Sequence, residues 1–456
     1  MPLEVVILAA GQGKRMHSTL PKVLHVLGSE PLLAHVLRAA RALKPDVVHV
    51  VFGHGGDRIR ATFTGEPVRW VHQAEQLGTG HAVAQAMPAV ADDSTVLVLY
   101  GDVPLIFPST LRDLISQAGA HRLGLLTVDL IDPQGYGRII RDDAGKVARI
   151  VEQKDATPQE VAVREVNTGI LAAPAGRLRG WLAGLENRNA QREYYLTDVV
   201  GKAVAEGVEV VTHQPRAAWE VLGVNSKREL AELERTYQKN TAQALLDQGV
   251  TVRDPARLDV RGELTCGRDV VIDVNVIFEG TVTLGDGVNI GPNNVIRDTS
   301  IGAATRVYAN CVIEEAEIGQ DCRVGPFARL RPGTRLADRA HIGNFVEVKN
   351  SVMGEGSKAN HLTYVGDSSV GKNVNIGAGT ITANYDGANK HRTDIHDNAS
   401  IGSNVVLVAP VSVGDGATIG AGSVITKDAP AGELTLTRAK QTTIAGWKRP
   451  SKKPKE

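Results

Sequence analysis

An apolar residue returns at every sixth position over long stretches of the chain between residues 260 and 425. The first run in one register is Val260, Cys266, Ile272, Phe278, Leu284, Ile290 and Ile296, and further runs cover 318–348 and 395–425. A helix would repeat near 3.6 residues and a strand near two, so this period indicates a short flat unit repeated around corners. Such units stack into a solenoid, whose coils bury their faces only against each other.

Breaks in this repeat are informative as well. The register slips at 348–353 and at 365–370, and it is lost at 376–395. The longest break contains Asn384-Tyr385-Asp386-Gly387, a turn-forming sequence that predicts an outward loop. We therefore expect regular coils to set the spacing and their breaks to carry functional residues.

Length and charge constrain the rest of the chain. A chain of 456 residues exceeds one ordinary core, so two or three domains are expected. We predict a first domain at 1–226, a helical connector at 227–250, the solenoid at 251–437 and a basic tail at 438–456. Basic and acidic residues both number 51, so no overall field favours nucleic acid or an anionic membrane as a partner.

The sequence also predicts a cellular compartment. Its N-terminus lacks a basic segment followed by an apolar one, and no apolar run approaches the roughly 18 residues of a membrane span. The three cysteines, Cys266, Cys311 and Cys322, fall within the repeats and show no metal-ligand spacing. We expect a cytoplasmic protein in a reduced compartment.

The first half begins with a buried-strand pattern at residues 3–10 that runs into Gly11-Gln12-Gly13-Lys14-Arg15. Such a turn points backbone N–H groups into one concavity, where they can hold phosphate oxygens. Arg15 and Lys22 add positive charge. The segment predicts a polyphosphate site, although glycine turns after strands also occur without a ligand.

Beyond this turn, strand-like and helix-like runs alternate, which predicts a three-layer α/β domain. The strand-like runs are 46–52, 68–71, 95–100 and 123–128, and the helix-like runs are 31–43, 80–90 and 108–118. Open sheets of this class bind ligands at the carboxyl ends of their strands. Polar or glycine-rich clusters at such ends contain Gln73, Gly78, Thr79, Tyr100, Asp102, Gly137, Glu152, Asn167 and Asn225.

Transfer of a nucleotidyl group to a sugar 1-phosphate would require such groups. Two anions must be neutralised and aligned for in-line attack on the α-phosphorus. Mg²⁺ suits this role, because it keeps its waters and phosphate oxygens and needs only one or two protein oxygens. Asp102 and Asn225 are the candidate Mg²⁺ ligands. The sugar phosphate is itself the nucleophile, so the protein need not supply one.

Polar residues set between the hexads form a second candidate site. Acyl transfer to an amine needs a base near neutral pH, and histidine has the appropriate pKa. We predict that His361 is this base and that Glu347 orients it. Arg331 and Lys349 are candidates to hold a sugar phosphate.

Longer motifs in both halves resemble one bacterial enzyme family. The segment 8–16 with Pro21-Lys22 resembles the signature of sugar-phosphate nucleotidylyltransferases. Five segments of the second half are similar to the acetyltransferase half of bacterial bifunctional N-acetylglucosamine-1-phosphate uridylyltransferases/glucosamine-1-phosphate N-acetyltransferases: 329–333, 343–349, 361–364, 375–380 and 384–387. The resemblance covers nearly the whole chain except its tail.

This resemblance implies a Rossmann-like α/β/α domain, a connecting helix and a left-handed parallel β-helix, assembled as a homotrimer with acetyl sites between subunits. It implies acetyl-CoA-dependent N-acetylation of glucosamine 1-phosphate. Mg²⁺-dependent uridylyl transfer from UTP to N-acetylglucosamine 1-phosphate, with release of pyrophosphate, would follow. The product, UDP-N-acetylglucosamine, would supply peptidoglycan and lipopolysaccharide synthesis.

The resemblance also implies roles for individual residues. It places Lys22 and Arg15 on the phosphates and Asp102 and Asn225 on Mg²⁺. On UTP and its amino-sugar partner it places Leu8, Ala9, Ala10, Gly11, Gly13, Gln73, Gly78, Thr79, Tyr100, Gly137, Glu152 and Asn167. In the second half it places Tyr364 and Asn375 beside Arg331 and Lys349 on the sugar phosphate, and on acetyl-CoA it places Ala378, Asn384, Tyr385, Ser403, Ala421 and Arg438.

Two alternatives stay open from the sequence. The chain can be a single-activity sugar-1-phosphate nucleotidylyltransferase whose solenoid assembles or regulates it, or the solenoid can be a purely structural or binding module. The set of His361, Arg331 and Lys349 favours the two-activity enzyme, because a scaffold needs no such residues.

Overall fold

A computed structural model describes residues 1–452 of the chain, which divides into two compact units, Met1–Tyr237 and Gln238–Glu456. Helix α8 (Lys227–Asp247) begins in the first unit and ends in the second. The last four residues of the predicted tail lie outside the described residues. The predicted fold class is confirmed, with an α/β unit followed by a parallel β-helix.

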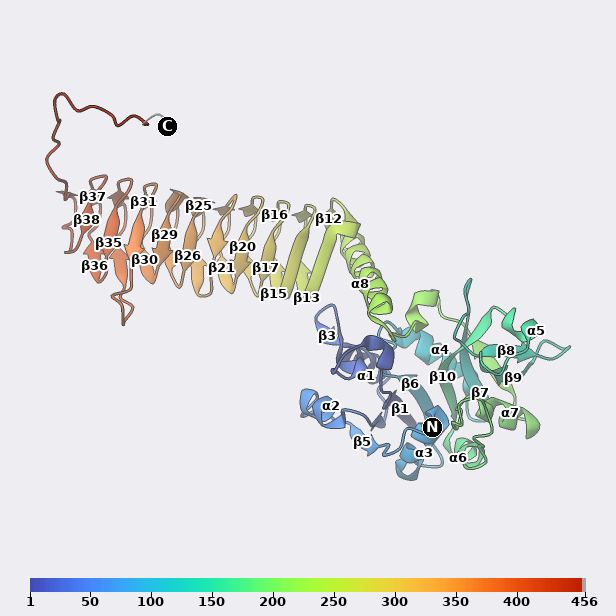
Figure 1. The fold of residues 1–456 in the computed structure, drawn as a ribbon. Helices are drawn as coiled ribbons and strands as arrows, with labels where there is room; N and C mark the ends of the chain where they lie inside the picture. The colour runs from blue at the N-terminus through green and yellow to red at the C-terminus, as the bar shows by residue number, and fades with distance from the viewer. Residues whose placement is uncertain (453–456) are drawn as a thin grey trace. The chain divides into compact units, whose positions relative to one another are not determined.

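A nine-stranded sheet forms the centre of the first unit (Figure 1). Its main path is β11-β7-β10-β6-β1-β4-β5, and β8 and β9 branch from β10. Strands β1, β4, β5 and β6 are parallel, whereas β10 runs antiparallel to β6 and β7. The strands are β1 (Leu3–Ala9), β4 (Val47–Phe52), β5 (Arg69–His72), β6 (Thr95–Tyr100), β7 (Leu123–Asp129), β8 (Arg138–Arg141), β9 (Val147–Val151), β10 (Glu165–Pro174) and β11 (Val210–His213).

Helices cover both faces of this sheet, because alternate side chains of β1 enter different cores. Val5 and Ile7 pack in a core with α1 and α4, while Val6 and Leu8 pack in a core with α3, α6 and α7. The helices are α1 (Leu32–Arg41), α2 (Gly56–Thr62), α3 (Thr79–Ala86), α4 (Pro108–Ala118), α5 (Pro158–Val161), α6 (Ala175–Ala183) and α7 (Asp198–Ala205), and a small hairpin joins β2 (Val26–Leu27) to β3 (Glu30–Pro31).

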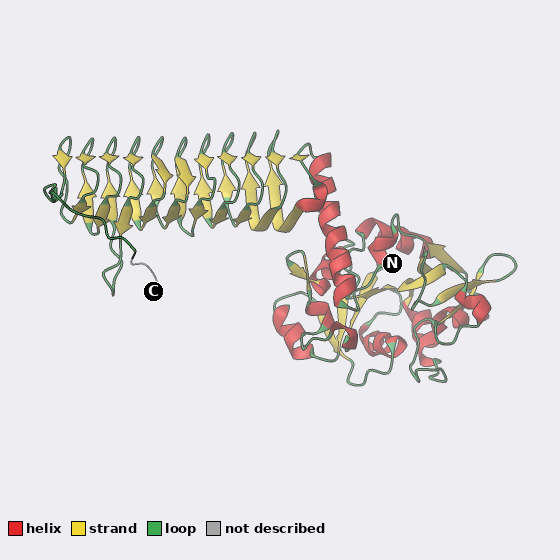
Figure 2. Ribbon diagram, turned by 45° about the horizontal axis from the view of Figure 1, so that its top comes forward, coloured by secondary structure: helices red, strands yellow, loops and turns green. Residues whose placement is uncertain are grey.

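The second unit is a stack of coils with three flat faces joined at corners (Figure 2). An 11-stranded sheet forms the first face: β12 (Thr251–Val252), β14 (Val271–Ile272), β16 (Asn289–Ile290), β19 (Arg306–Val307), β22 (Arg323–Val324), β25 (His341–Asn344), β28 (Lys358–His361), β31 (Asn375–Ile376), β34 (Ser400–Ile401), β37 (Thr418–Ile419) and β39 (Leu434–Thr435).

A 17-stranded sheet forms the other two faces and starts with the long strands β13 (Leu258–Cys266) and β15 (Val276–Leu284). The second face contains β17 (Val295–Arg297), β20 (Val312–Glu314), β23 (Arg329–Leu330), β26 (Glu347–Lys349), β29 (Tyr364–Gly366), β32 (Ile381–Ala383), β35 (Val406–Val408) and β38 (Val424–Ile425). The third face contains β18 (Ser300–Ile301), β21 (Ala316–Ile318), β24 (Thr334–Leu336), β27 (Val352–Met353), β30 (Ser368–Val370), β33 (Thr393–Ile395) and β36 (Val411–Val413).

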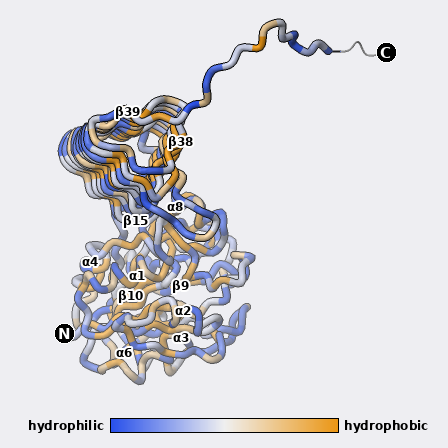
Figure 3. The backbone as a smooth tube through the Cα atoms, turned by 90° about the vertical axis from the view of Figure 1, so that its left-hand side faces the viewer, coloured by the Kyte–Doolittle hydropathy of each residue, from blue (hydrophilic) through white to orange (hydrophobic). Residues whose placement is uncertain are grey.

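The hexad residues point into this stack. Ile290, Val307, Val324 and Ile342 pair in register on successive strands of the first face, and each is at most 1% exposed. Hydrophobic and hydrophilic residues therefore alternate along the coils (Figure 3). The predicted loop is confirmed, because residues 384–392 leave the stack between β32 and β33 as a short hairpin.

Two absences hold for the described part of the chain. None of its helices is both long and apolar enough to cross a membrane. Cys266, Cys311 and Cys322 form no disulfide, and the last two are buried within the β-helix core. Burial raises the pKa of the Cys311 thiol to about 11, as expected for a packing residue.

Candidate functional site

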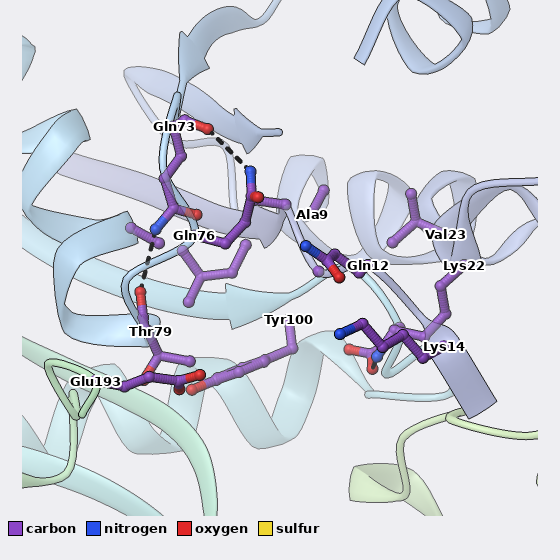
Figure 4. A pocket seen from close by; sticks show the side chains of 16 residues that line it. Ala9, Gln12, Lys14, Lys22, Val23, Gln73, Gln76, Thr79, Tyr100 and Glu193 are labelled. Carbon is purple, nitrogen blue, oxygen red and sulfur yellow. Dashed lines mark hydrogen bonds and ion pairs between the residues drawn. The ribbon is translucent and has the colours of Figure 1, made fainter. Parts of the chain in front are cut away.

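The first candidate site is a cavity of about 500 Å³ at the carboxyl ends of β1 and β6 (Figure 4). Ten residues that the sequence predicts to bind the nucleotide line it: Leu8, Ala9, Ala10, Gly11, Lys22, Gln73, Gly78, Thr79, Tyr100 and Asp102. Gly13, Arg15, Gly137, Glu152, Asn167 and Asn225 do not line it, whereas Gln12, Lys14, Gln76 and Glu193 line it without having been predicted. Glu193 lies far away in sequence, and no motif marks it.

The glycine-rich loop presents free donors to this cavity. Within the described residues, the N–H groups of Gly11 and Gln12, which line the cavity, and of the adjacent Gly13 donate to no protein acceptor. Gly13 has a φ of +61°, and a Cβ there would lie 2.9 Å from Cβ of Lys22. A side chain at residue 13 would therefore strain the backbone and push the lysine away. The loop can hold phosphate oxygens through its backbone.

A lysine, a carboxylate and an amide converge at the edge of this cavity. The Lys22 ammonium donates to Asp102 Oδ2, and its Nζ lies 3.1 Å from Asn225 Oδ1. Asn225 is held in place because its N–H donates to Glu229 Oε2 at 2.6 Å and the N–H of Val224 donates to Asp102 O at 2.9 Å. The side-chain oxygens of Asp102 and Asn225, which are far apart in sequence, thus both face the Lys22 ammonium.

This donor set fits Mg²⁺. Mg²⁺ prefers hard oxygen ligands and takes only one or two from the protein when phosphates supply the others. The Asp102 carboxylate and the Asn225 amide provide two such oxygens directed at a common point. Among residues 1–452, no cluster of three or more His, Cys, Asp or Glu side chains could hold a metal on its own.

Gln73 forms a rigid part of the cavity wall. Its Nε2 donates to Gly78 O at 3.2 Å, and Gln76 donates to Gln73 O at 3.3 Å (Figure 4). The same Nε2 also donates to His81 Nδ1 at 3.0 Å. The side chain is fixed at the start of α3, where an amide can recognise the polar edge of a base.

Tyr100 connects the cavity to a second group of predicted residues. A Cβ at Gly137 would lie 3.3 Å from Glu152 Oε1, and the N–H of Asn167 donates to Gly137 O at 2.8 Å. Burial, followed by the charges of Glu152 and Asp102, raises the pKa of Tyr100, so its hydroxyl stays protonated. Gly137, Glu152 and Asn167 are therefore brought together beside this ring.

The second candidate site lies at the corner between the first and second faces of the β-helix. His361 is exposed, and its Nδ1 lies 2.8 Å from Asn344 Oδ1, one coil earlier. With the amide oxygen as acceptor, Nδ1 carries the proton and Nε2 keeps its lone pair. Glu347 instead accepts from Arg331 Nη1 at 2.7 Å. The prediction that Glu347 orients His361 is therefore wrong, because register places Asn344 against the ring.

Small side chains continue the line of this histidine. Pairing between successive coils places Ala378, Ser403 and Ala421 at the corner position that His361 occupies. Ser403 and Ala421 are exposed, so a shallow strip without bulky side chains runs from the imidazole along the stack. An extended thiol ester can lie along such a strip.

Cations gather on the second face beside this corner. Arg331 and Lys349 stand on successive rungs, and the long loop adds Lys390. Contact with Lys390, and then burial, lowers the pKa of Lys349. Like charges held together in this way favour an anion between them. Sequence reasoning missed Lys390, and its place in the longest break of the repeat was the available signal.

The other predicted residues surround this corner or lie beyond it. Tyr364 pairs in register with Glu347, and Asn375 is exposed on the first face next to Lys358. The buried Asn384 side chain donates to Asp367, while Tyr385 is 61% exposed. Arg438 is exposed, and its Nη2 would lie 3.6 Å from a Cβ at Gly420.

Comparison with known proteins identifies the family. The model of the MobA-like NTP transferase domain matches residues 5–252, and that of the bacterial transferase hexapeptide matches residues 392–427. Relatives named "Bifunctional protein GlmU" match over the full length. That of Aromatoleum aromaticum is 62% identical over 451 residues and covers 99% of both chains. The chain belongs to the bifunctional GlmU family.

Two further members of this family are also similar to the chain over nearly its full length. The Cupriavidus pinatubonensis protein is 60% identical over 454 residues and covers 100% of both chains. The Bordetella parapertussis protein is 58% identical over 456 residues, covering 99% of this chain and 100% of the relative. The resemblance predicted from motifs is confirmed. The protein is a bifunctional transferase, so the single-activity and scaffold alternatives are set aside.

Proposed function

We propose that the two units divide the synthesis of UDP-N-acetylglucosamine between them. The β-helix transfers the acetyl group of acetyl-CoA to glucosamine 1-phosphate. The α/β unit then transfers uridylyl from UTP to the resulting N-acetylglucosamine 1-phosphate and releases pyrophosphate. The convergence of Lys22, Asp102 and Asn225 beside the unpaired N–H groups of the glycine loop is the main support for the second reaction.

In uridylyl transfer, this chain supplies binding and charge. The loop N–H groups hold the triphosphate, and Lys22 and Arg15 offset the negative charge of the two reacting anions. Gln73, Gly78 and Thr79 recognise the uracil, while Gly137, Glu152 and Asn167 hold the amino sugar. Asp102 and Asn225 would hold Mg²⁺, which when bound neutralises phosphate charge.

In acetyl transfer, His361 Nε2 takes a proton from the substrate ammonium. The freed amine attacks the thioester carbonyl, the C–S bond breaks, and the second proton lost by the nitrogen passes to the sulfur, so that CoA leaves as its thiol while His361 returns its proton to solvent. Asn344 fixes the tautomer that leaves Nε2 basic. Arg331, Lys349 and Lys390 hold the substrate phosphate with Tyr364 and Asn375, and the strip of Ala378, Ser403 and Ala421 receives acetyl-CoA with Asn384, Tyr385 and Arg438.

We also infer a homotrimer in the cytoplasm. His361 and Asn375 are exposed on the first face of one β-helix, and Arg331, Lys349 and Tyr364 are half-buried on the adjacent face, so a neighbouring subunit would complete the walls around them. The three free cysteines support a reduced compartment. Sedimentation of the full chain should give three times its monomer mass, and a monomer at the working concentration would refute this arrangement.

Omission of single substrates tests the order of the two reactions. With glucosamine 1-phosphate, acetyl-CoA, UTP and Mg²⁺ present, both CoA and UDP-N-acetylglucosamine should form. Without acetyl-CoA no UDP-N-acetylglucosamine should appear, whereas without UTP the release of CoA should continue. Synthesis of UDP-N-acetylglucosamine without acetyl-CoA would contradict the proposal.

A further inference from the structure

Four basic residues stand on successive rungs of the first face of the β-helix. Arg306, Arg323, His341 and Lys358 pair in register, and the residue next to each points into the core. We name these four residues the basic ladder. Neighbouring strands lie about 4.8 Å apart, so the ladder presents a row of donors along the stack.

This ladder lines a groove of about 590 Å³ that also contains Tyr308. Within residues 1–452, the side chains of Arg306, Arg323 and Lys358 make no ion pair and no hydrogen bond with the protein. Asp321 is the only described acidic residue that lines the groove. The positive charge along this face is therefore largely uncompensated.

In another row of residues on the same β-helix, carboxylates compensate the positive charges. There Arg and Glu alternate from rung to rung, in the order Arg261, Glu279, Arg297 and Glu314. Arg297 lies 3.2 Å from Glu279 and 2.9 Å from Glu314, so one cation joins two carboxylates. The fold readily accommodates alternating charges, and the like charges of the basic ladder are a departure from that pattern.

Like charges directly opposite each other destabilise a sheet unless an anion lies between them. Burial, and then the charges of Arg323 and Lys358, lower the pKa of His341, which leaves a neutral imidazole between cations. A single phosphate spans only part of a row of this length. A ligand with several phosphates in line matches it better.

We propose that the basic ladder binds a linear polyphosphate group. The phosphates lie along the outer face of the 11-stranded sheet, between the guanidinium groups of Arg306 and Arg323 and the ammonium of Lys358. This site is separate from the glycine loop of the first unit and from Arg331 and Lys349 on the second face. It does not depend on the reactions proposed above. UTP, pyrophosphate and CoA all contain linked phosphate groups.

Calorimetric titration of the full chain with tripolyphosphate, without Mg²⁺, tests the proposal. In the variant Arg306→Gln/Arg323→Gln/Lys358→Gln, one binding site per chain should be lost or weakened at least about tenfold, as expected for loss of several charge-assisted hydrogen bonds. The matched control Arg268→Gln/Arg335→Gln/Lys372→Gln removes three positive charges elsewhere on the β-helix and should bind as the wild type does. These control residues each lie near an acidic partner.

Equal binding by the ladder variant and the wild type would overturn the proposal, as would an equal loss in the control. Sedimentation of the same proteins supplies an independent check. A ladder variant that no longer assembles like the wild type would assign this face to contact between subunits and would overturn the ligand site. If the site holds, titration with pyrophosphate, UTP and CoA in turn identifies the source of the polyphosphate by relative affinity.

Discussion

The two catalytic sites proposed for this chain are built in opposite ways. The nucleotidyl site is a cavity inside one unit, where Asp102 is 8% exposed and strand ends bring distant residues together. The acetyl site is a strip along an edge, where His361 is exposed and its neighbours come from successive coils. The difference teaches that tertiary packing forms the first site, whereas the register of a repeat forms the second.

This contrast predicts that each site fails independently. The largest effect is expected for Asp102→Ala, which removes the buried carboxylate that contacts the Lys22 ammonium and would hold Mg²⁺. Uridylyl transfer should fall about a thousandfold, the upper range for loss of one electrostatic stabilising group. Release of pyrophosphate measures it. Release of CoA by the same protein should stay within about twofold of wild type, and a parallel loss would show that the substitution disturbs more than one site.

The matching change in the β-helix is His361→Ala. Acetyl transfer should fall at least about a hundredfold, as expected for loss of a general base. Release of CoA in the presence of glucosamine 1-phosphate measures it. Uridylyl transfer to N-acetylglucosamine 1-phosphate should be unchanged, because the histidine lies in a different compact unit. An acetyl-transfer rate near that of wild type would assign the base to another residue.

A smaller effect should separate Asn344 from Glu347. Asn344→Ala removes the hydrogen bond to Nδ1 and should lower kcat of acetyl transfer about tenfold, the equivalent of roughly 1.4 kcal/mol. Its pH–rate profile should shift as well, because the tautomer is no longer fixed. Glu347→Gln, by contrast, loosens Arg331 and should act mainly on KM for glucosamine 1-phosphate. If Glu347→Gln lowers kcat and Asn344→Ala does not, the roles are reversed.

The smallest expected effect concerns the pH dependence of stability in the first unit. Burial, and then the charges of Asp198 and Asp155, raise the pKa of Glu152 above its ordinary value of 4.5. The folded state then binds this proton more tightly than the unfolded state, so stability falls as pH rises from 4.5 through the folded pKa. In Glu152→Gln residue 152 does not titrate, so the free energy of unfolding lacks this pH-dependent decrease.

Urea unfolding of wild type and Glu152→Gln at several pH values tests this pH dependence of stability. The free energy of unfolding of the variant, relative to wild type, should increase with pH across that window and then level off. A constant difference at all pH values would mean that Glu152 titrates alike in the folded and unfolded states.

Much of the fold could be predicted because local patterns determine it. The helix at 108–118 has the predicted ends, and the hexads point into the β-helix core. The contrast between the two sites explains what could not be predicted. A coil near the acetyl site spans 17 residues, so the partner of His361 is Asn344 rather than Glu347, which is nearer in sequence. Coil length depends on corners whose geometry the apolar repeat does not encode.

The missed residues have the same origin. Lys390 reaches Lys349 from a loop that interrupts the repeat, and Glu193 joins the nucleotide cavity from a loop between α6 and α7. Neither belongs to a local pattern, and each reaches its site only through tertiary placement. By contrast, Lys22 follows a glycine turn and Asp102 follows the end of a strand. Ligands of such sheets bind at these places, so the sequence predicts both the type of residue and its position in the site.

The central claim, two independent sites in one chain, is tested most directly by measuring both half-reactions in the same preparations of Asp102→Ala and His361→Ala. Release of pyrophosphate is measured with N-acetylglucosamine 1-phosphate, UTP and Mg²⁺, and release of CoA with glucosamine 1-phosphate and acetyl-CoA. Each variant should lose one half-reaction and keep the other at the wild-type rate. Loss of both half-reactions in either variant would contradict the account.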